Sequence, residues 1–79
     1  MTTIEAVEVL KQGQPVKHKR FTICRDPLTE TRFAVYERGY PNVYVTCSDP
    51  ENAIRFVNRG NTGDYATPMA QIKIKFEPV

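Results

Sequence analysis

Four aromatic and basic residues near the middle of the sequence are the side chains best suited to recognising another molecule. They are Tyr36, Arg38, Tyr40 and Tyr44, which fall within nine positions of one another. Tyrosine and arginine often carry the binding energy of protein interfaces. We therefore predict a protein-binding surface here, although tyrosines also commonly line the edge of a small core with the hydroxyl in water.

A second group of candidate binding residues is basic and includes Lys17, Lys19, Arg20 and Arg25. Such side chains could contact the phosphates of a nucleic acid. Lysines on an exposed strand also discourage pairing with other chains, so the run could simply protect an edge. Strand alternation would place Lys17 and Lys19 on one face and Arg20 on the other. The net charge of +2 gives the whole molecule only a weak field.

Residues suited to catalysis or metal binding are few and scattered. Ser48 is the only serine and is better explained as a helix cap, and His18 has no acidic neighbour in sequence to orient it. No glycine-rich phosphate loop is present. One histidine with Cys24 and Cys47 does not supply the four closely spaced ligands of structural zinc. We predict no enzymatic activity, no cofactor and no metal.

Three segments between residues 21 and 47 have the alternation of strands in an antiparallel sheet. Phe21 and Ile23 mark the first, Phe33 and Val35 the second, and the third includes Val43, Val45 and Cys47. Proline, glycine, aspartate or asparagine separates them at residues 26–30 and 38–42, as expected for short turns.

A helix is predicted directly after these strands. Ser48 and Glu51 have capping-box spacing, and Pro50 suits a first helical turn. Gly60 is placed to end the helix in the left-handed conformation.

The flanking segments complete the predicted fold. Thr2 and Glu5 have capping-box spacing and favour a helix over residues 3–12, while the β-branched residues there leave a strand as the alternative. Residues 61–68 are typical of a loop, and the apolar alternation of residues 70–76 predicts a strand. We predict one α+β domain over residues 1–79, with about four antiparallel strands, two helices on one face and the order α-β-β-β-α-β.

The composition is that of an ordinary globular protein, with 41% hydrophobic and 25% charged residues. No apolar run approaches the roughly 20 residues of a membrane span, and the first residues do not form a signal peptide. We therefore expect a cytoplasmic protein. In that compartment Cys24 and Cys47 are expected as reduced core thiols.

Two nucleic-acid-binding families share features with this sequence. The predicted order α-β-β-β-α resembles the double-stranded-RNA-binding domain, although Asp49 and Glu51 make the start of the second helix acidic where that family is lysine-rich. Arg38-Gly39-Tyr40 followed by Val43 resembles a fragment of the RNA-recognition motif.

The first quarter of the chain has a further resemblance. Residues 5–13, with Val16 and the basic residues after it, are similar to the opening of small phage-encoded domains, including the anti-Thoeris sponge family. His18 and Phe21 stand where those domains typically carry an arginine and a tryptophan. The resemblance implies a phage or mobile-element protein and capture of a small anionic nucleotide.

Three hypotheses for function follow from the sequence. The first is a non-catalytic accessory or inhibitory protein of a phage or mobile element, which binds a host macromolecule, expected to be another protein, through the stretch from Tyr36 to Tyr44. The second is nucleic-acid binding through the basic run, and the third is sequestration of a small anionic ligand.

Overall fold

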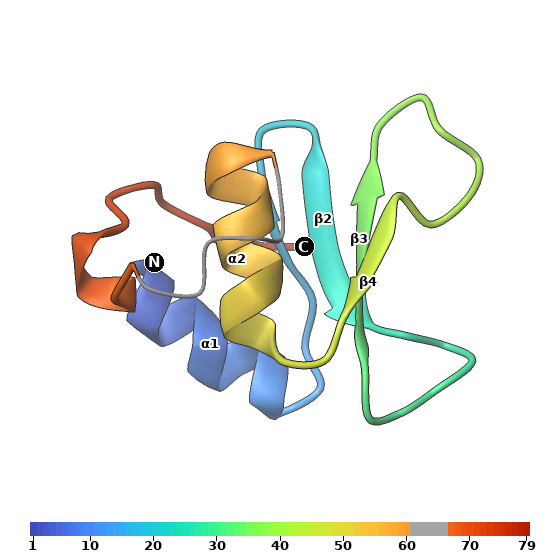
Figure 1. The fold of residues 1–79 in the computed structure, drawn as a ribbon, viewed down its shortest axis with the longest axis horizontal. Coiled ribbons are helices and arrows are strands. Elements are labelled where there is room, and N and C mark those ends of the chain that lie inside the picture. Colours follow the sequence, from blue (N-terminus) through green and yellow to red (C-terminus); the bar gives the residue numbers. More distant parts are fainter. Residues whose placement is uncertain (61–66) are drawn as a thin grey trace.

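The computed structural model describes residues 1–60 and 67–79, which form an antiparallel sheet with two helices packed on one face (Figure 1). The predicted α+β class is therefore confirmed. The helices are α1 (Thr3–Lys11) and α2 (Pro50–Arg59), with a short 3-10 helix η1 (Met69–Gln71). The strands are β1 (Val16–His18), β2 (Phe21–Arg25), β3 (Phe33–Glu37), β4 (Val45–Cys47) and β5 (Glu77–Pro78). Their order in the sheet is β4-β3-β2-β1-β5.

Helix α1 forms as the capping box predicts, and the strand alternative for residues 3–12 is wrong. The Thr2 side chain accepts a hydrogen bond from the Glu5 backbone, and the Glu5 carboxylate accepts one from the Thr2 backbone. Ala6, Val7 and Leu10 are buried against the rest of the core. Periodic burial and a satisfied first turn together outweigh the β-branched residues.

Helix α2 begins one residue later than the sequence indicates, because its N-cap is Asp49 and not Ser48. The Asp49 carboxylate accepts hydrogen bonds from the backbone and side-chain nitrogens of Asn52, at 2.7 and 3.2 Å. A carboxylate at this position also interacts favourably with the helix dipole. At the other end Gly60 ends α2 with φ +79°, as predicted.

The basic run does not simply lead into the first strand, because it forms a strand and a turn of its own. His18 pairs with Phe21, so Lys19 and Arg20 make a two-residue turn between β1 and β2. Lys19 has φ +52°, a region that favours glycine or asparagine. No glycine or asparagine marks this turn in the sequence, which is why the additional strand was not predicted.

The predicted strand over residues 70–76 is wrong, because none of these residues belongs to a strand. Residues 69–71 form η1, and only Glu77 and Pro78 pair with a neighbouring strand, at Lys17 and Val16 of β1. Ile72 and Phe76 are nevertheless buried, so the alternation correctly indicates which side chains face the core, although the segment is not a strand. Of the loop predicted at residues 61–68, positions 61–66 lie outside the described residues.

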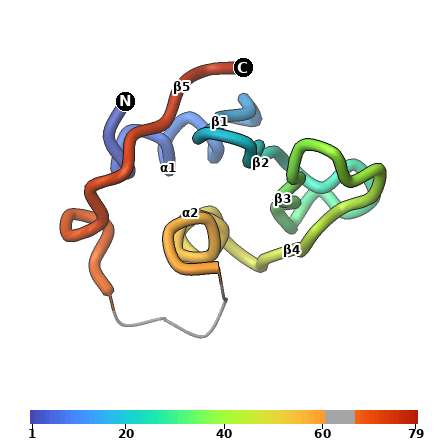
Figure 2. The backbone as a smooth tube through the Cα atoms, turned by 90° about the horizontal axis from the view of Figure 1, so that it is seen from above, coloured from blue at the N-terminus to red at the C-terminus, as the bar shows by residue number. Residues whose placement is uncertain are grey.

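The C-terminal segment is tied to the start of the chain. The backbones of Met1 and Phe76 exchange two hydrogen bonds of 2.6 and 2.9 Å. The Thr3 hydroxyl donates to the Met69 carbonyl at 2.7 Å. Figure 2 shows this segment passing α1 on its way to β1, where β5 forms an outer strand of the sheet.

One hydrophobic cluster joins both helices, the sheet and the C-terminal segment. Its fully buried large side chains are Leu10, Val16, Ile23, Val35, Ile54 and Phe76. Cys24 and Cys47 pair with consecutive residues of β3, Ala34 and Phe33, so they lie on opposite faces of the sheet. Both thiols are free, with Cys47 buried and Cys24 half-buried.

Candidate binding site around the first hairpin

Several connections meet at one end of the molecule. The turn between β1 and β2, the connection from β3 to β4 and the last turn of α2 all lie toward the top of Figure 1. Strands β1 and β3 end at this end of the molecule, and β2 and β4 begin there. This end of the molecule carries the candidate site.

The first feature of the site is a hollow with a volume of about 410 Å³, which we call the basic hollow. Its lining residues are Lys17, His18, Lys19, Arg38, Lys75 and Glu77. Four of these side chains are permanent cations at neutral pH and only one is a carboxylate. The basic hollow therefore has a local excess of positive charge that the net charge of +2 does not suggest.

Two contacts to backbone carbonyls explain how distant residues reach the basic hollow. The backbone N–H of Arg38 donates to the Arg20 carbonyl at 2.9 Å, which places Arg38 beside the first hairpin. The Nδ1 atom of His18 lies 2.7 Å from the Lys75 carbonyl, which holds the C-terminal segment against β1. The His18 ring also packs against Phe76, with ring centroids 5.7 Å apart.

A second hollow, the hairpin groove, lies next to the basic hollow and has a volume of about 490 Å³. It is lined by His18, Lys19, Arg20, Phe21, Val57, Asn58 and Ile74. The two hollows share His18 and Lys19, so together they surround the tip of the first hairpin. The hairpin groove adds apolar surface from α2 and the C-terminal segment to the cations of the turn.

Arg20 is partly neutralised within the site. Its Nε lies 2.6 Å from the Glu37 Oε2, and its guanidinium lies 5.8 Å from the centre of the Phe21 ring. A cation already paired with a carboxylate has less charge to offer an anion. Lys19, Arg38 and Lys75 are all exposed, and within residues 1–60 and 67–79 none of them forms an ion pair like that of Arg20.

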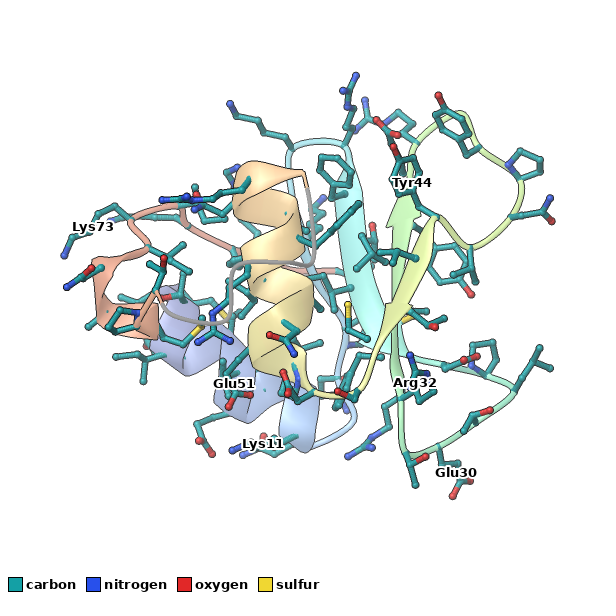
Figure 3. The ribbon with its side chains drawn as sticks, in the orientation of Figure 1. Lys11, Glu30, Arg32, Tyr44, Glu51 and Lys73 are labelled. Atoms are coloured by element: carbon teal, nitrogen blue, oxygen red, sulfur yellow. The ribbon has the colours of Figure 1, made fainter. Side chains whose placement is uncertain are left out.

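Beyond the hairpin groove lies a group of four rings that we call the aromatic cluster: Phe21, Tyr40, Tyr44 and Phe56. The Tyr44 ring centre lies 5.4 Å from that of Phe56, 5.7 Å from Tyr40 and 6.5 Å from Phe21. Tyr40 and Tyr44 remain 59% and 49% exposed. Figure 3 places Tyr44 near the connection from β3 to β4, on the upper side of the molecule.

The four residues of the predicted protein-binding surface are divided by the sheet. Tyr40 and Tyr44 belong to the aromatic cluster, and Arg38 lines the basic hollow. Tyr36 pairs with Thr22, so it lies on the face of the sheet opposite the helices. Burial, followed by the nearby Cys24 and Asp26, raises the pKa of the Tyr36 hydroxyl. Proximity in sequence therefore does not make these four side chains one surface.

The predicted nucleic-acid-binding residues are brought together with one exception. Lys17 and Lys19 line the basic hollow, and Lys19 and Arg20 line the hairpin groove. Arg25 lies at the other end of β2, where its guanidinium donates to the carbonyls of Lys11 and Glu30 at 2.8 Å each. Figure 3 places Lys11 and Glu30 at the end of the molecule away from Tyr44.

Lys75 lines the basic hollow, although the sequence does not identify it as a candidate binding residue. It lies in the segment of alternating lysine and isoleucine that predicts a strand with two lysines facing solvent. The alternation correctly indicates that Lys75 is exposed. Its place beside β1 depends instead on the contact with His18, which is 57 residues away in the sequence. Pairing across such a separation leaves no local pattern.

Residues 1–60 and 67–79 contain no group of three or more histidine, cysteine or acidic side chains that could hold a metal ion. Within the same ranges, no helix has the length and apolar character needed to cross a membrane. Comparisons of the chain with protein-family models, curated proteins and solved structures find no match.

Proposed function

We propose that this chain is a non-catalytic nucleic-acid-binding protein that holds phosphates in the basic hollow. The observation that supports the proposal is the convergence of Lys17, Lys19, Arg38 and Lys75 on one hollow from three separate segments. Lysine and arginine are the residues that neutralise nucleic-acid phosphates. Glu77 is the single carboxylate on the lining and leaves the excess charge positive.

The convergence of these charges favours ligand binding over a purely solubilising role. Lysines that protect a strand edge need only be exposed, and they repel one another less when they are spread apart. Here the Arg38 backbone is instead bonded to the Arg20 carbonyl, and the Lys75 carbonyl contacts the His18 side chain, so both residues are held beside the first hairpin. A bound polyanion would relieve the repulsion among the four cations, and this relief would contribute to affinity.

The proposal is tested by fluorescence anisotropy of labelled single-stranded and double-stranded oligonucleotides across a salt series. We expect affinity to fall linearly in log salt, because bound phosphates release counterions. In the variant Lys19→Ala/Arg38→Ala, the loss of two phosphate contacts lowers the slope by about 1.4 for a single strand or about 1.8 for a duplex.

The matched control is Lys11→Ala/Lys73→Ala. It removes the same amount of charge from two exposed residues that do not line the basic hollow. Equal weakening in both double variants would mean that only the net charge matters. An absence of binding by the unchanged protein at low salt would refute the proposed function.

A small nucleotide is the other source of phosphate that the basic hollow suits. The resemblance of residues 5–13 to phage-encoded domains supports this form of the proposal and a role as a phage accessory or inhibitory protein. Competition separates the two sources. A mononucleotide that displaces the labelled oligonucleotide at micromolar concentration would identify a nucleotide-sequestering protein, whereas displacement only by oligonucleotides of increasing length would identify a strand-binding one.

Exposure of Tyr40 and Tyr44 favours a second candidate function, the binding of another protein. These two rings lie next to Val43, which is 37% exposed, and together they form an apolar surface on the connection from β3 to β4. Buried tyrosines commonly dominate the energy of an interface. In affinity capture from a host lysate, Tyr40→Ala should lose a partner that Leu28→Ala retains. Leu28 is the matched control because it is 92% exposed and lies on another connection.

A further inference from the structure

The cations of the basic hollow and the exposed rings of the aromatic cluster form one continuous path. His18 and Lys19 line both the basic hollow and the hairpin groove. Phe21 lines the hairpin groove and lies 6.5 Å from Tyr44, which in turn lies 5.7 Å from Tyr40. A chain molecule that starts among the cations therefore reaches the rings by passing over the tip of the first hairpin, at His18 and Lys19.

Tyr44 is both exposed and held in place. Half of its surface is accessible, and the remainder packs against Phe56 of α2 and Phe21 of β2. A ring supported by the core loses little conformational freedom when a second ring stacks on it. Tyr40 stands edge-on to Tyr44, with an angle of 86° between the ring planes, and is more exposed.

We infer that the ligand of this site is a single-stranded nucleic acid whose bases stack on Tyr44 and Tyr40 while its phosphates lie in the basic hollow. This inference rests on the proposed function and specifies its ligand. Proteins that bind single strands combine a positively charged groove with aromatic side chains in this way. In a duplex the base faces are covered by neighbouring base pairs, so the rings of the aromatic cluster could not reach them.

The experiment compares three labelled ligands of equal length: an oligodeoxythymidine strand, an abasic strand with the same phosphates, and a duplex. Each is titrated into the unchanged protein, into Tyr40→Leu/Tyr44→Leu and into Lys19→Ala/Arg38→Ala. Tyr36→Leu is the matched control, because Tyr36 lies on the face of the sheet opposite Phe21 and lines neither hollow. Leucine keeps much of the apolar packing against Phe56.

We expect the unchanged protein to bind the thymidine strand at least about fivefold more tightly than the abasic strand, as expected for one stacked base. Tyr40→Leu/Tyr44→Leu should remove this preference and leave the salt slope unchanged. Tyr36→Leu should retain it. The charge variant should weaken the binding of all three ligands and lower the salt slope.

The outcomes separate this inference from the proposed function. Equal affinity for the thymidine and abasic strands, with a loss of binding in the charge variant, would overturn the inference and leave phosphate binding intact. A Tyr40→Leu variant that loses a protein partner but retains the thymidine preference would assign the rings to protein binding. Failure of every ligand to bind the unchanged protein would overturn both proposals.

A second measurement covers the case in which Tyr40→Leu/Tyr44→Leu does not fold. The sequence has no tryptophan, so its intrinsic fluorescence comes from tyrosine. Stacking should quench this fluorescence when the unchanged protein binds the thymidine strand, and the quenching should shrink in Tyr40→Leu alone. Unchanged emission at saturation would contradict stacking on either ring.

Discussion

Arg20 and Glu37 form an ion pair in which Nε and Oε2 lie 2.6 Å apart, and the two side chains differ in exposure, at 66% for Arg20 and 7% for Glu37. Removal of Arg20 would leave a nearly buried carboxylate without this partner. We expect Arg20→Ala to lower the free energy of unfolding by about 1–3 kcal/mol, the usual range for an unsatisfied buried group. Urea denaturation measures the change.

The control for the ion pair is a double-mutant cycle with Glu37→Gln. In that background Arg20→Ala should cost less, because no charge is left unpaired. Lys19→Ala, at the neighbouring turn position, is expected to stay within about 0.5 kcal/mol of the unchanged protein. Equal costs for Arg20→Ala in both backgrounds would show that the arginine acts through packing on Phe21 instead.

The cap of α2 gives a prediction that distinguishes two adjacent residues. Asp49→Ala removes the acceptor for the Asn52 backbone and should cost about 1 kcal/mol. Ser48→Ala should change stability by less than about 0.5 kcal/mol, because Ser48 is exposed and does not cap the helix. Thermal unfolding of the two variants checks the difference, and a larger loss for Ser48→Ala would mean that the helix begins earlier.

Thr3 should control the attachment of the C-terminal segment. Its hydroxyl is buried and donates to the carbonyls of Met69 and Ile72, at 2.7 and 3.3 Å. Thr3→Val keeps the shape but leaves these carbonyls without the donor, and we expect a loss of about 1–3 kcal/mol. Amide hydrogen exchange should also become faster at Ile72 and Phe76.

Thr3→Ser provides the comparison for this prediction. Serine retains the hydroxyl and loses only a methyl group, so exchange at Ile72 and Phe76 should stay close to that of the unchanged protein. If Thr3→Ser were as damaging as Thr3→Val, the methyl group and not the hydrogen bonds would be responsible.

The two thiols should make the protein less stable at alkaline pH. Burial raises the pKa of both thiols, and the nearby carboxylates Asp26, beside Cys24, and Asp49, beside Cys47, raise them further. A group with a raised pKa in the folded state stabilises the protein fully below its unfolded pKa, about 8.5 for cysteine. That contribution is then lost as the pH rises toward the pKa of the folded state.

Urea denaturation between pH 7 and pH 10 measures this loss. Unfolding free energy should decline across the range, and the decline should be smaller in Cys24→Ala/Cys47→Ala. Tyr36, whose pKa is also raised, would leave a residual decline in that variant. The explanation fails if the double variant follows the same pH profile as the unchanged protein.

The sequence predicts those helices and strands that are specified by residues close together in the chain. Both helices carry their caps within three residues, and β2, β3 and β4 show their alternation and turn residues directly. The capping signal of α2 was still ambiguous, because Ser48 and Asp49 are both good N-cap residues and only the hydrogen bonds to Asn52 decide between them.

Contacts between distant segments could not be predicted in the same way. The turn at Lys19 adopts a positive φ without the residue types that normally signal it. Lys75 reaches the basic hollow through His18, and Tyr44 turns toward Phe56 although Val45, the next residue, also faces the core from β4. Each of these arrangements depends on packing between segments that are distant in the sequence. The basic and aromatic side chains could therefore be recognised from the sequence, but which of them lie together could not.

The position of Lys75 and Glu77 in the basic hollow has a consequence for synthesis of the protein. These residues complete a lining that begins at Lys17, so the hollow is incomplete on a ribosome-bound chain until residues 75–77 have emerged from the exit tunnel. Folding of such long-range contacts is also slow compared with helix formation. The lining of the basic hollow is therefore complete only after translation has passed this segment, whichever molecule the hollow binds.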